Sequence, residues 1–152
     1  MNLLVTGSRK ITNPDIIKII FDYLALKPNV LIHGGASGVD TLSTNYFQHQ
    51  IWVEETLTIG SKSQDHIRRE LGRLENQAKQ KGMMNNLVVR PRYDHTNDRA
   101  APIRRNIEMV KLLNPDVDIA VAIWDGESAG TLKTINKLLD NNIQTYIFTV
   151  RI

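Results

Sequence analysis

Short apolar runs alternate along the chain with longer segments of helical periodicity. Strands are predicted at residues 2–6, 30–33, 87–89, 117–124 and 143–150, where each apolar run is brief and bounded by turn-forming residues. Helices are predicted from Asn13 to before Pro28, from 37 to about 48, over 102–113 and over 131–139. This order is typical of an α/β, Rossmann-like parallel sheet with helices on both faces.

The first helix carries the clearest boundary signals. Asn13 suits the capping position, Pro14 suits the first turn, and Pro28 cannot continue the helix. Its buried face is expected at Ile16, Ile17, Ile20, Phe21 and Leu24.

Residues 51–86 interrupt this rhythm and are interpreted as an insertion. An extra strand is expected within 51–59, and a charged helix with a narrow apolar seam within 64–81. The seam suits packing against the domain or against a second copy of the chain. Residues 1–152 are otherwise expected to form a single domain, since 152 residues with 41% hydrophobic content suffice for one core.

Composition narrows the chemistry further. The chain has no cysteine, which excludes disulfides and thiolate sites and is compatible with a reducing, cytoplasmic location. Its longest apolar run, Ile119 to Trp124, is far too short for a membrane helix. The histidines have no metal-ligand spacing, so no metal is expected. No cofactor is expected either.

The net charge of +3 is unevenly distributed. Between Lys62 and Arg105 there are eleven Lys and Arg residues against five Asp and Glu, whereas the remainder carries eight against eleven. A basic segment suits an anionic ligand or a nucleic acid, although a charged helix face is also commonly only solvated.

Two glycine-rich turns follow apolar runs and precede helices. The first is His33-Gly34-Gly35-Ala36-Ser37-Gly38-Val39-Asp40, and the second runs from Asp125 to Thr131. Glycines let a phosphate approach the backbone, and helix N-termini present unpaired N–H groups to it. If both turns meet at the sheet edge, they form one electropositive cradle.

Polar residues near these turns supply candidate contacts. Arg9 and Arg105 suit charge-assisted phosphate binding. Asp40 either accepts from ribose hydroxyls or, at capping-box spacing from Ser37, serves a structural role. Asn106 either reads a base edge or ties down a loop, and Trp124 either stacks on a base or belongs to the core.

The motifs resemble the SLOG superfamily, which includes DprA/Smf proteins and LOG phosphoribohydrolases, and most closely its small YspA-like branch. The resemblance is carried by Val5-Thr6-Gly7-Ser8-Arg9, by residues 33–40, by Arg105-Asn106 with Met109, and by Gly126 with Gly130-Thr131. It implies a nucleotide or nucleotide-derived ligand, bound at the carboxyl ends of the strands and often in a homo-oligomer. We expect the protein to be a ligand sensor or accessory module. The expected ligand-binding residues are Gly7, Ser8, Arg9, His33, Gly34, Gly35, Ser37, Gly38, Asp40, Arg105, Asn106, Gly126, Ser128, Gly130 and Thr131.

Two other functions remain open. An N-glycosidase, phosphoribohydrolase or nucleoside deoxyribosyltransferase would need a carboxylate beside the ribose, for which Glu127, Asp125, Asp40 and Glu108 are candidates. The glutamates that follow the Gly-Thr pair in LOG enzymes are replaced here by Lys133 and Thr134. Single-stranded DNA binding in the manner of DprA ranks third, because the basic segment contains a single aromatic residue, Tyr93.

Overall fold

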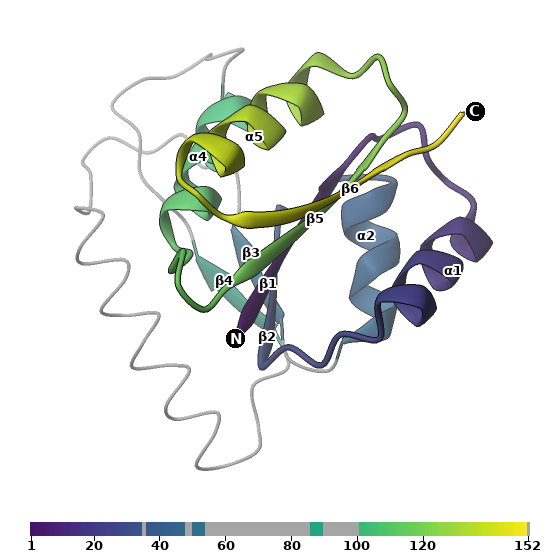
Figure 1. Ribbon diagram of the computed structural model, residues 1–152. Coiled ribbons are helices and arrows are strands. Elements are labelled where there is room, and N and C mark those ends of the chain that lie inside the picture. Colours follow the sequence, from purple (N-terminus) through teal and green to yellow (C-terminus); the bar gives the residue numbers. More distant parts are fainter. Residues whose placement is uncertain (35, 48–49, 54–85, 90–100, 152) are drawn as a thin grey trace.

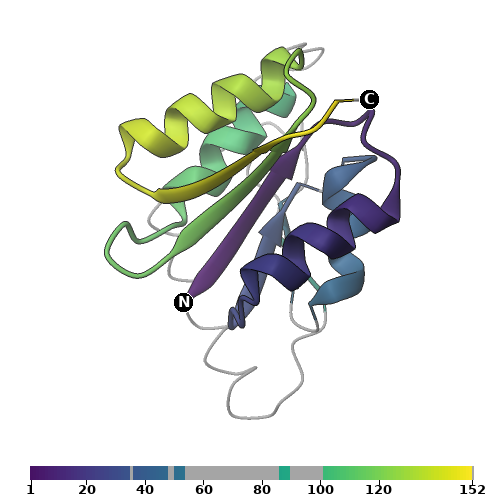
Figure 2. The same ribbon diagram turned by 45° about the vertical axis from the view of Figure 1, so that its right-hand side comes forward.

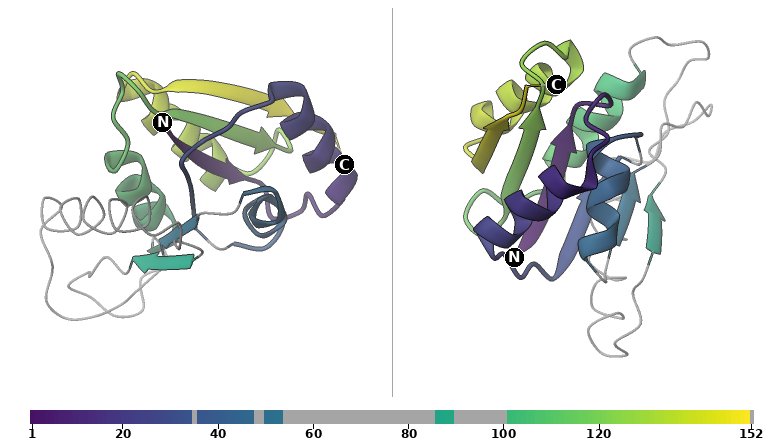
Figure 3. Two further views of the ribbon diagram at one scale, coloured as in Figure 1. Left: turned by 90° about the horizontal axis from the view of Figure 1, so that it is seen from below. Right: turned by 90° about the vertical axis from the view of Figure 1, so that its right-hand side faces the viewer.

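A parallel β-sheet forms the centre of the computed structural model, which describes residues 1–34, 36–47, 50–53, 86–89 and 101–151 (Figure 1). Within these residues the strands are β1 (Asn2–Gly7), β2 (Val30–His33), β3 (Gln50–Val53), β4 (Asn86–Val89), β5 (Ile119–Trp124) and β6 (Gln144–Thr149). Their order in the sheet is β4-β3-β2-β1-β5-β6, and every neighbouring pair is parallel. β4 and β6 therefore lie at opposite edges (Figure 3).

Helices cover both faces of the sheet, which confirms the predicted fold class. They are α1 (Pro14–Leu24), α2 (Val39–Ser43) with the short 3-10 helix η1 (Thr44–Tyr46), α4 (Ala101–Lys111) and α5 (Ala129–Asp140). α1 and α2 lie on one face, and α4 and α5 lie on the other (Figures 1 and 2). None of the helices in the described ranges has the length and apolar character that crossing a bilayer requires.

Alternating side chains of the central strands divide the core into two layers. Leu4, Ile32 and Ala120 pack with Met109 of α4 and Leu138 of α5. The intervening residues point to the other face, where they meet α1 and Val39; they include Leu3, Val5, Leu31 and Val121. This double burial explains why the strands read as continuous apolar runs rather than as alternating ones.

Helix α1 begins and ends as its sequence signals predict. The Asn13 side chain accepts a hydrogen bond from the Asp15 N–H at 3.0 Å, and Pro14 opens the helix. Ile17, Ile20 and Phe21 are buried. The helix ends at Leu24 because Ala25 adopts a left-handed conformation, three residues before Pro28.

Several predicted boundaries were wrong. The helix expected over 37–48 is interrupted after Ser43, since η1 follows and strand β3 begins at Gln50. The strand predicted at 87–89 is confirmed as β4, and β3 begins the strand expected within 51–59. Both belong to the main sheet, so the proposed insertion began too early in the chain. The helix predicted at 64–81 lies outside the described residues. β5 starts at Ile119 because Val117 and Asp118 form a turn onto the Asn114 carbonyl.

Candidate functional site

The site lies where the chain changes direction across the sheet. β1 and β5 are neighbours, but β1 leads to β2 through α1 on one face, whereas β5 leads to β6 through α5 on the other. Such a switch point opens a crevice at the carboxyl ends of the strands. Here it holds a cleft of about 520 Å³, lined by Thr6, Gly7, Arg9, Lys10, Ala36, Asp40, Arg105, Asn106, Asp125, Glu127, Ser128, Gly130 and Thr131.

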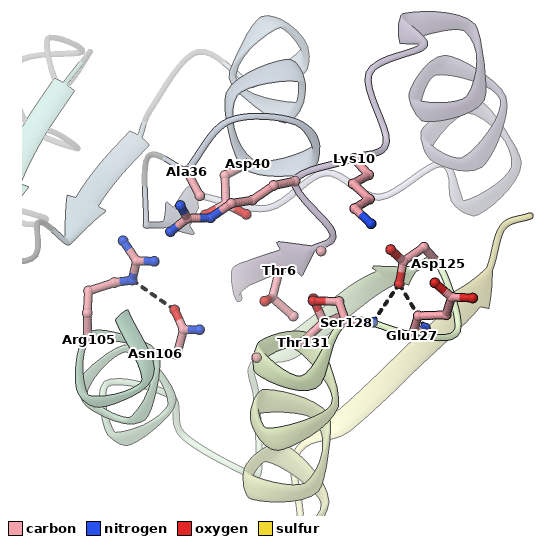
Figure 4. Close-up of a pocket in the computed structure, with 13 residues that line it drawn as sticks. Thr6, Lys10, Ala36, Asp40, Arg105, Asn106, Asp125, Glu127, Ser128 and Thr131 are labelled. Atoms are coloured by element: carbon pink, nitrogen blue, oxygen red, sulfur yellow. Dashed lines mark hydrogen bonds between the residues drawn. The ribbon is translucent and has the colours of Figure 1, made fainter. Parts of the chain in front are cut away.

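Both glycine-rich turns contribute to this cleft. Ala36 and Asp40 come from the first turn and helix α2, and the second turn supplies Ser128, Gly130 and Thr131 (Figure 4). Residues about ninety positions apart in sequence therefore face one cavity. The lining side chains include three cations and three carboxylates, so the electropositive character of the cradle stays a prediction that rests on its cations and on the helix N-termini.

The first turn of α5 forms one wall. Asp125 Oδ1 accepts hydrogen bonds from the N–H groups of Glu127 at 2.9 Å and Ser128 at 2.8 Å, which shapes the turn before the helix. These bonds lower the pKa of the Asp125 carboxyl, which therefore stays ionised. Thr131 Oγ1 lies 3.2 Å from Ser128 Oγ, so two hydroxyls stand at the helix start.

Gly130 leaves open space in this wall. A Cβ built on Gly130 would meet nothing within 4 Å, although the residue lines the cleft. The N–H groups of the first helical turn have no intrahelical partner and are available there. This is the geometry in which a helix N-terminus binds an anion.

Asp40 lies across the cleft from Ser128 and Thr131 (Figure 4). Its side chain is 4% exposed, and Oδ2 accepts a hydrogen bond from the Gly34 N–H at 3.0 Å. Burial raises the pKa of Asp40 to about 6, although the Arg105 guanidinium and the N–H groups of Gly34 and Ala36 favour its ionised form.

Arg105 holds the first turn in place from helix α4. It is also 4% exposed; Nη1 donates to the Gly34 carbonyl and Nε donates to Asn106 Oδ1 at 2.8 Å. The Gly34 peptide is thus bound at its N–H by Asp40 and at its carbonyl by Arg105. A Cβ on Gly34 would lie 2.5 Å from Arg105 Cζ, so this glycine makes room for a side chain of the protein.

Gly7 and Gly38 also serve the packing of the protein itself. A Cβ on Gly7 would lie 2.5 Å from the Ile123 carbonyl, and one on Gly38 would lie 2.6 Å from the Arg9 carbonyl. Gly38 caps α2 with φ +81°, a conformation that side chains disfavour. The capping-box interpretation of Ser37 was wrong, because Gly38 is the N-cap and Asp40 bonds to Gly34 instead.

Other predicted site residues lie outside the lining. Ser8 is buried, and its Oγ accepts from the Asp125 N–H at 3.0 Å, which ties the loop after β1 to the end of β5. Ser37 is exposed, and Gly126 turns the chain with φ +84°. Gly35 lies outside the described residues.

Two aromatic residues near the cleft, His33 and Trp124, also serve the scaffold. His33 is 4% exposed, and burial lowers its pKa to about 4, so the ring is neutral at pH 7. Trp124 is half-buried and donates from Nε1 to the Ser128 carbonyl at 3.0 Å, which fixes the entry to α5. Neither side chain lines the cleft.

Thr6, Lys10 and Ala36 line the cleft and were not predicted. Lys10 extends toward the loop of Asp125 and Ser128 (Figure 4). Lys10 could have been predicted as a cleft residue, because it follows the predicted ligand-binding residue Arg9 in the loop after the first strand. In the described ranges, no group of three or more His, Cys, Asp or Glu side chains is arranged to hold a metal ion.

Comparison with known proteins supports the fold. No family model matches the chain, and no curated protein matches it. The crystal structure of DNA processing protein A (DprA) from Streptococcus pneumoniae is similar, with a TM-score of 0.59 and 17% sequence identity. The match covers 96% of this chain and 49% of that one, so the chain spans about half the length of DprA. The protein therefore has a DprA-like, Rossmann-like α/β fold.

Proposed function

We propose that the cleft binds a nucleotide or a nucleotide-derived molecule through its phosphate, and that the protein acts as a ligand sensor or accessory module. The observation that carries this proposal is the open first turn of α5, where a Cβ on Gly130 would meet no atom within 4 Å and two hydroxyls flank the helix start. A volume of about 520 Å³ is in the range of small-molecule sites.

Cations around the cleft support a phosphate at this position. Lys10 and Arg9 are exposed and line the cleft, so they can approach a bound anion. Arg105 is committed to the Gly34 carbonyl and Asn106, which makes it a positioning residue for the first turn. We propose the phosphate at the N-terminus of α5, with Lys10 and Arg9 as its cations and Arg105 as a further cation of the lining.

The sequence motifs and the DprA-like fold together favour a SLOG protein of the YspA-like branch, working in the cytoplasm as a homo-oligomer. The fold likeness concerns the scaffold, whereas the motifs concern the site. Sensor function is proposed over catalysis because Asp125 shapes the turn before α5, and because Lys133 and Thr134 stand where LOG enzymes have glutamates. Glu127 is exposed and lines the cleft, so it stays a candidate carboxylate.

Thermal-shift and calorimetric titrations test the proposal. The four ribonucleoside 5′-monophosphates are compared with the matching nucleosides and with inorganic phosphate. A ligand that binds only the folded state raises the melting temperature, by an amount that grows with its concentration. We expect at least one monophosphate to bind about tenfold or more tightly than its nucleoside, since charge-assisted hydrogen bonds are lost with the phosphate. Equal affinity for both forms, or binding of neither, would contradict the proposal.

Turnover is tested on the same ligands. Asp40 is the buried carboxylate of the cleft, and its raised pKa suits acid or base chemistry at an N-glycosidic bond. Chromatography after long incubation detects any free base. Release of free base would show that the protein is an N-glycosidase rather than a sensor. Intact nucleotide after the incubation would support the sensor function.

Single-stranded DNA is a second candidate ligand, favoured by the fold shared with a DNA processing protein. A fluorescent oligonucleotide would then bind with strong salt dependence, because phosphate contacts release counterions. Unchanged anisotropy at low salt would remove this candidate.

A further inference from the structure

Strand β6 is an edge of the sheet that is open to pairing. Among the described strands it pairs with β5 alone (Figure 3). The Val150 N–H, just after the strand, bonds to the Trp124 carbonyl of β5. Because alternate N–H groups of a strand point to opposite sides, those of Thr145, Ile147 and Thr149 point away from β5. Edge strands commonly carry a charge, a proline or a bulge that prevents pairing with another chain, whereas β6 has no charged residue or proline and keeps an unbroken register with β5.

Apolar side chains flank this edge on the face of α5. Ile147 lies on that face, because it pairs with Ala122, two residues from Ala120 of the core layer beneath α4 and α5. Leu132 and Leu139 lie two turns apart on α5, on the side away from the groove that this helix shares with α4. The side chains of Leu132, Leu139 and Ile147 are between 40% and 50% exposed.

A second apolar group flanks the edge on the face of α1. The Phe148 ring packs edge-on against Tyr23, with ring centroids 6.5 Å apart. Tyr23 is 78% exposed, and Ile19, one turn earlier on α1, is 66% exposed. The β6 surface is formed by the exposed apolar residues of both groups, Ile19, Tyr23, Leu132, Leu139 and Ile147.

The size of the β6 surface suits an interface with another protein chain. Its exposed side chains offer on the order of 500 Å², since a large side chain buries about 150 to 250 Å². Monomeric proteins rarely expose a contiguous apolar patch larger than about a few hundred Å². A standard interface takes about 800 Å² from each partner, and the open strand edge with its polar neighbours supplies the remainder.

We infer that the β6 surface binds a second copy of the chain, with the two β6 strands antiparallel across a twofold axis, so that the two sheets join into one. Charge favours a second copy in this arrangement. Asp140 precedes the amino end of β6, Arg151 follows its carboxyl end, and both are exposed. Antiparallel pairing brings Asp140 of each copy toward Arg151 of the other, whereas parallel pairing would bring like charges together. The inference gives a surface to the homo-oligomer of the proposed function and does not depend on the ligand.

Sedimentation velocity of the full 152-residue chain across the micromolar range tests the inference. We expect a dimer. A monomer throughout this range would overturn the inference, and so would an assembly larger than a dimer. Neither result bears on nucleotide binding, which the titrations of the monophosphates test separately.

Ile147→Lys tests the surface. Ile147 lies in the middle of β6, so the two copies would bring two ammonium groups together at the twofold axis. The dimer dissociation constant should rise about a hundredfold or more, because like charges side by side in an interface cost several kcal/mol. Val117→Lys is the matched control, because Val117 is also an exposed aliphatic residue and lies outside the β6 surface, in the turn before β5. The control should stay dimeric. A folded Ile147→Lys variant with wild-type dimerisation would overturn the inference.

Reversal of the two flanking charges tests the antiparallel arrangement on exposed residues. Arg151→Glu should weaken the dimer about tenfold at low salt, because two contacts related by the twofold axis change from attraction to repulsion. Adding Asp140→Arg to this variant should restore the wild-type affinity. No effect of Arg151→Glu, or no recovery in the double variant, would overturn the antiparallel arrangement.

Discussion

The glycines of the two turns have different physical roles. Gly34 and Gly38 have protein atoms where a Cβ would stand, whereas Gly130 has open space. The sequence predicted all of them as room for a phosphate. It could not distinguish them, because the atoms that fill the space beside Gly34 belong to Arg105, 71 positions away.

Gly130→Ala should separate stability from binding. Alanine is favoured over glycine in a helix, and nothing obstructs its Cβ, so the variant should gain about 0.5 to 1 kcal/mol of unfolding free energy. The same methyl group occupies the cleft, so affinity for the best-bound monophosphate should fall about tenfold. Thermal unfolding and calorimetry measure the two effects. A stabilised variant with unchanged affinity would place the phosphate elsewhere.

Asp40 and His33 should have opposite effects on stability as the pH changes. The pKa of Asp40 is raised to about 6, so its contribution is full below its unfolded pKa near 4 and is lost as the pH rises through 6. The pKa of His33 is lowered from 6.5 to about 4, so its contribution is full above 6.5 and is lost as the pH falls toward 4. Between pH 4 and 6 the two nearly cancel.

Asp40→Asn removes one side of this balance. On lowering the pH from 7 to 4, the free energy of unfolding should fall by about 2 to 3 kcal/mol more in the variant than in the wild type. The variant keeps the loss that comes from His33 and lacks the compensating gain from Asp40. Urea unfolding at a series of pH values measures the difference. Parallel stability curves for the two proteins would contradict the raised pKa of Asp40.

At the scale of elements, strands and long helices followed from the sequence, and the short elements did not. The sequence predicted the first residues of α1 correctly, because the capping residue Asn13 and the first-turn residue Pro14 act on their immediate neighbours in the chain. A strand was expected within 51–59 as part of an insertion, and β3 (Gln50–Val53) lies there, but four residues carry too little periodicity to reveal its pairing with β2 and β4 in the main sheet. α2 is short because η1 follows it directly, before the chain enters β3.

The contact between the loop after β1 and the start of α2 depends on Gly38. Gly38→Ala adds a methyl group 2.6 Å from the Arg9 carbonyl and 2.7 Å from the Ser8 carbonyl, at a φ of +81°. Backbone atoms cannot move aside cheaply, so we expect a loss of about 3 kcal/mol and a melting temperature lower by roughly 10 °C. Calorimetric unfolding measures this. A loss under about 1 kcal/mol would show that the loop adapts.

For the molecule as a whole, the two ends of the sheet divide binding from stability. The cleft opens at the carboxyl ends of the strands. At the opposite end of the sheet, Asp118 accepts hydrogen bonds from Asn2, at the start of β1, and from Asn114, in the turn that precedes β5. The sequence placed the cleft correctly at the carboxyl ends, because the parallel order of strands fixes where the turns gather. Asp118 was predicted only as part of a strand.

Asp118→Ala should lower stability without changing the cleft. It leaves the N–H groups of Asn2 and Asn114 without their acceptor, which costs about 2 kcal/mol. Thermal unfolding should register this loss while the affinity for monophosphates stays within twofold of wild type. A parallel loss of affinity would show that the two ends are coupled.

The bond from the Trp124 indole to the Ser128 carbonyl gives the protein an intrinsic optical reporter. The ring is attached to the residue that precedes the first turn of α5, so a ligand that reorders this turn should alter the fluorescence of Trp124. The chain has two tryptophans, and replacing Trp52 by phenylalanine would leave Trp124 as the sole tryptophan, which can be excited selectively over the tyrosines. Ligand arrival could then be followed in real time without attaching a dye.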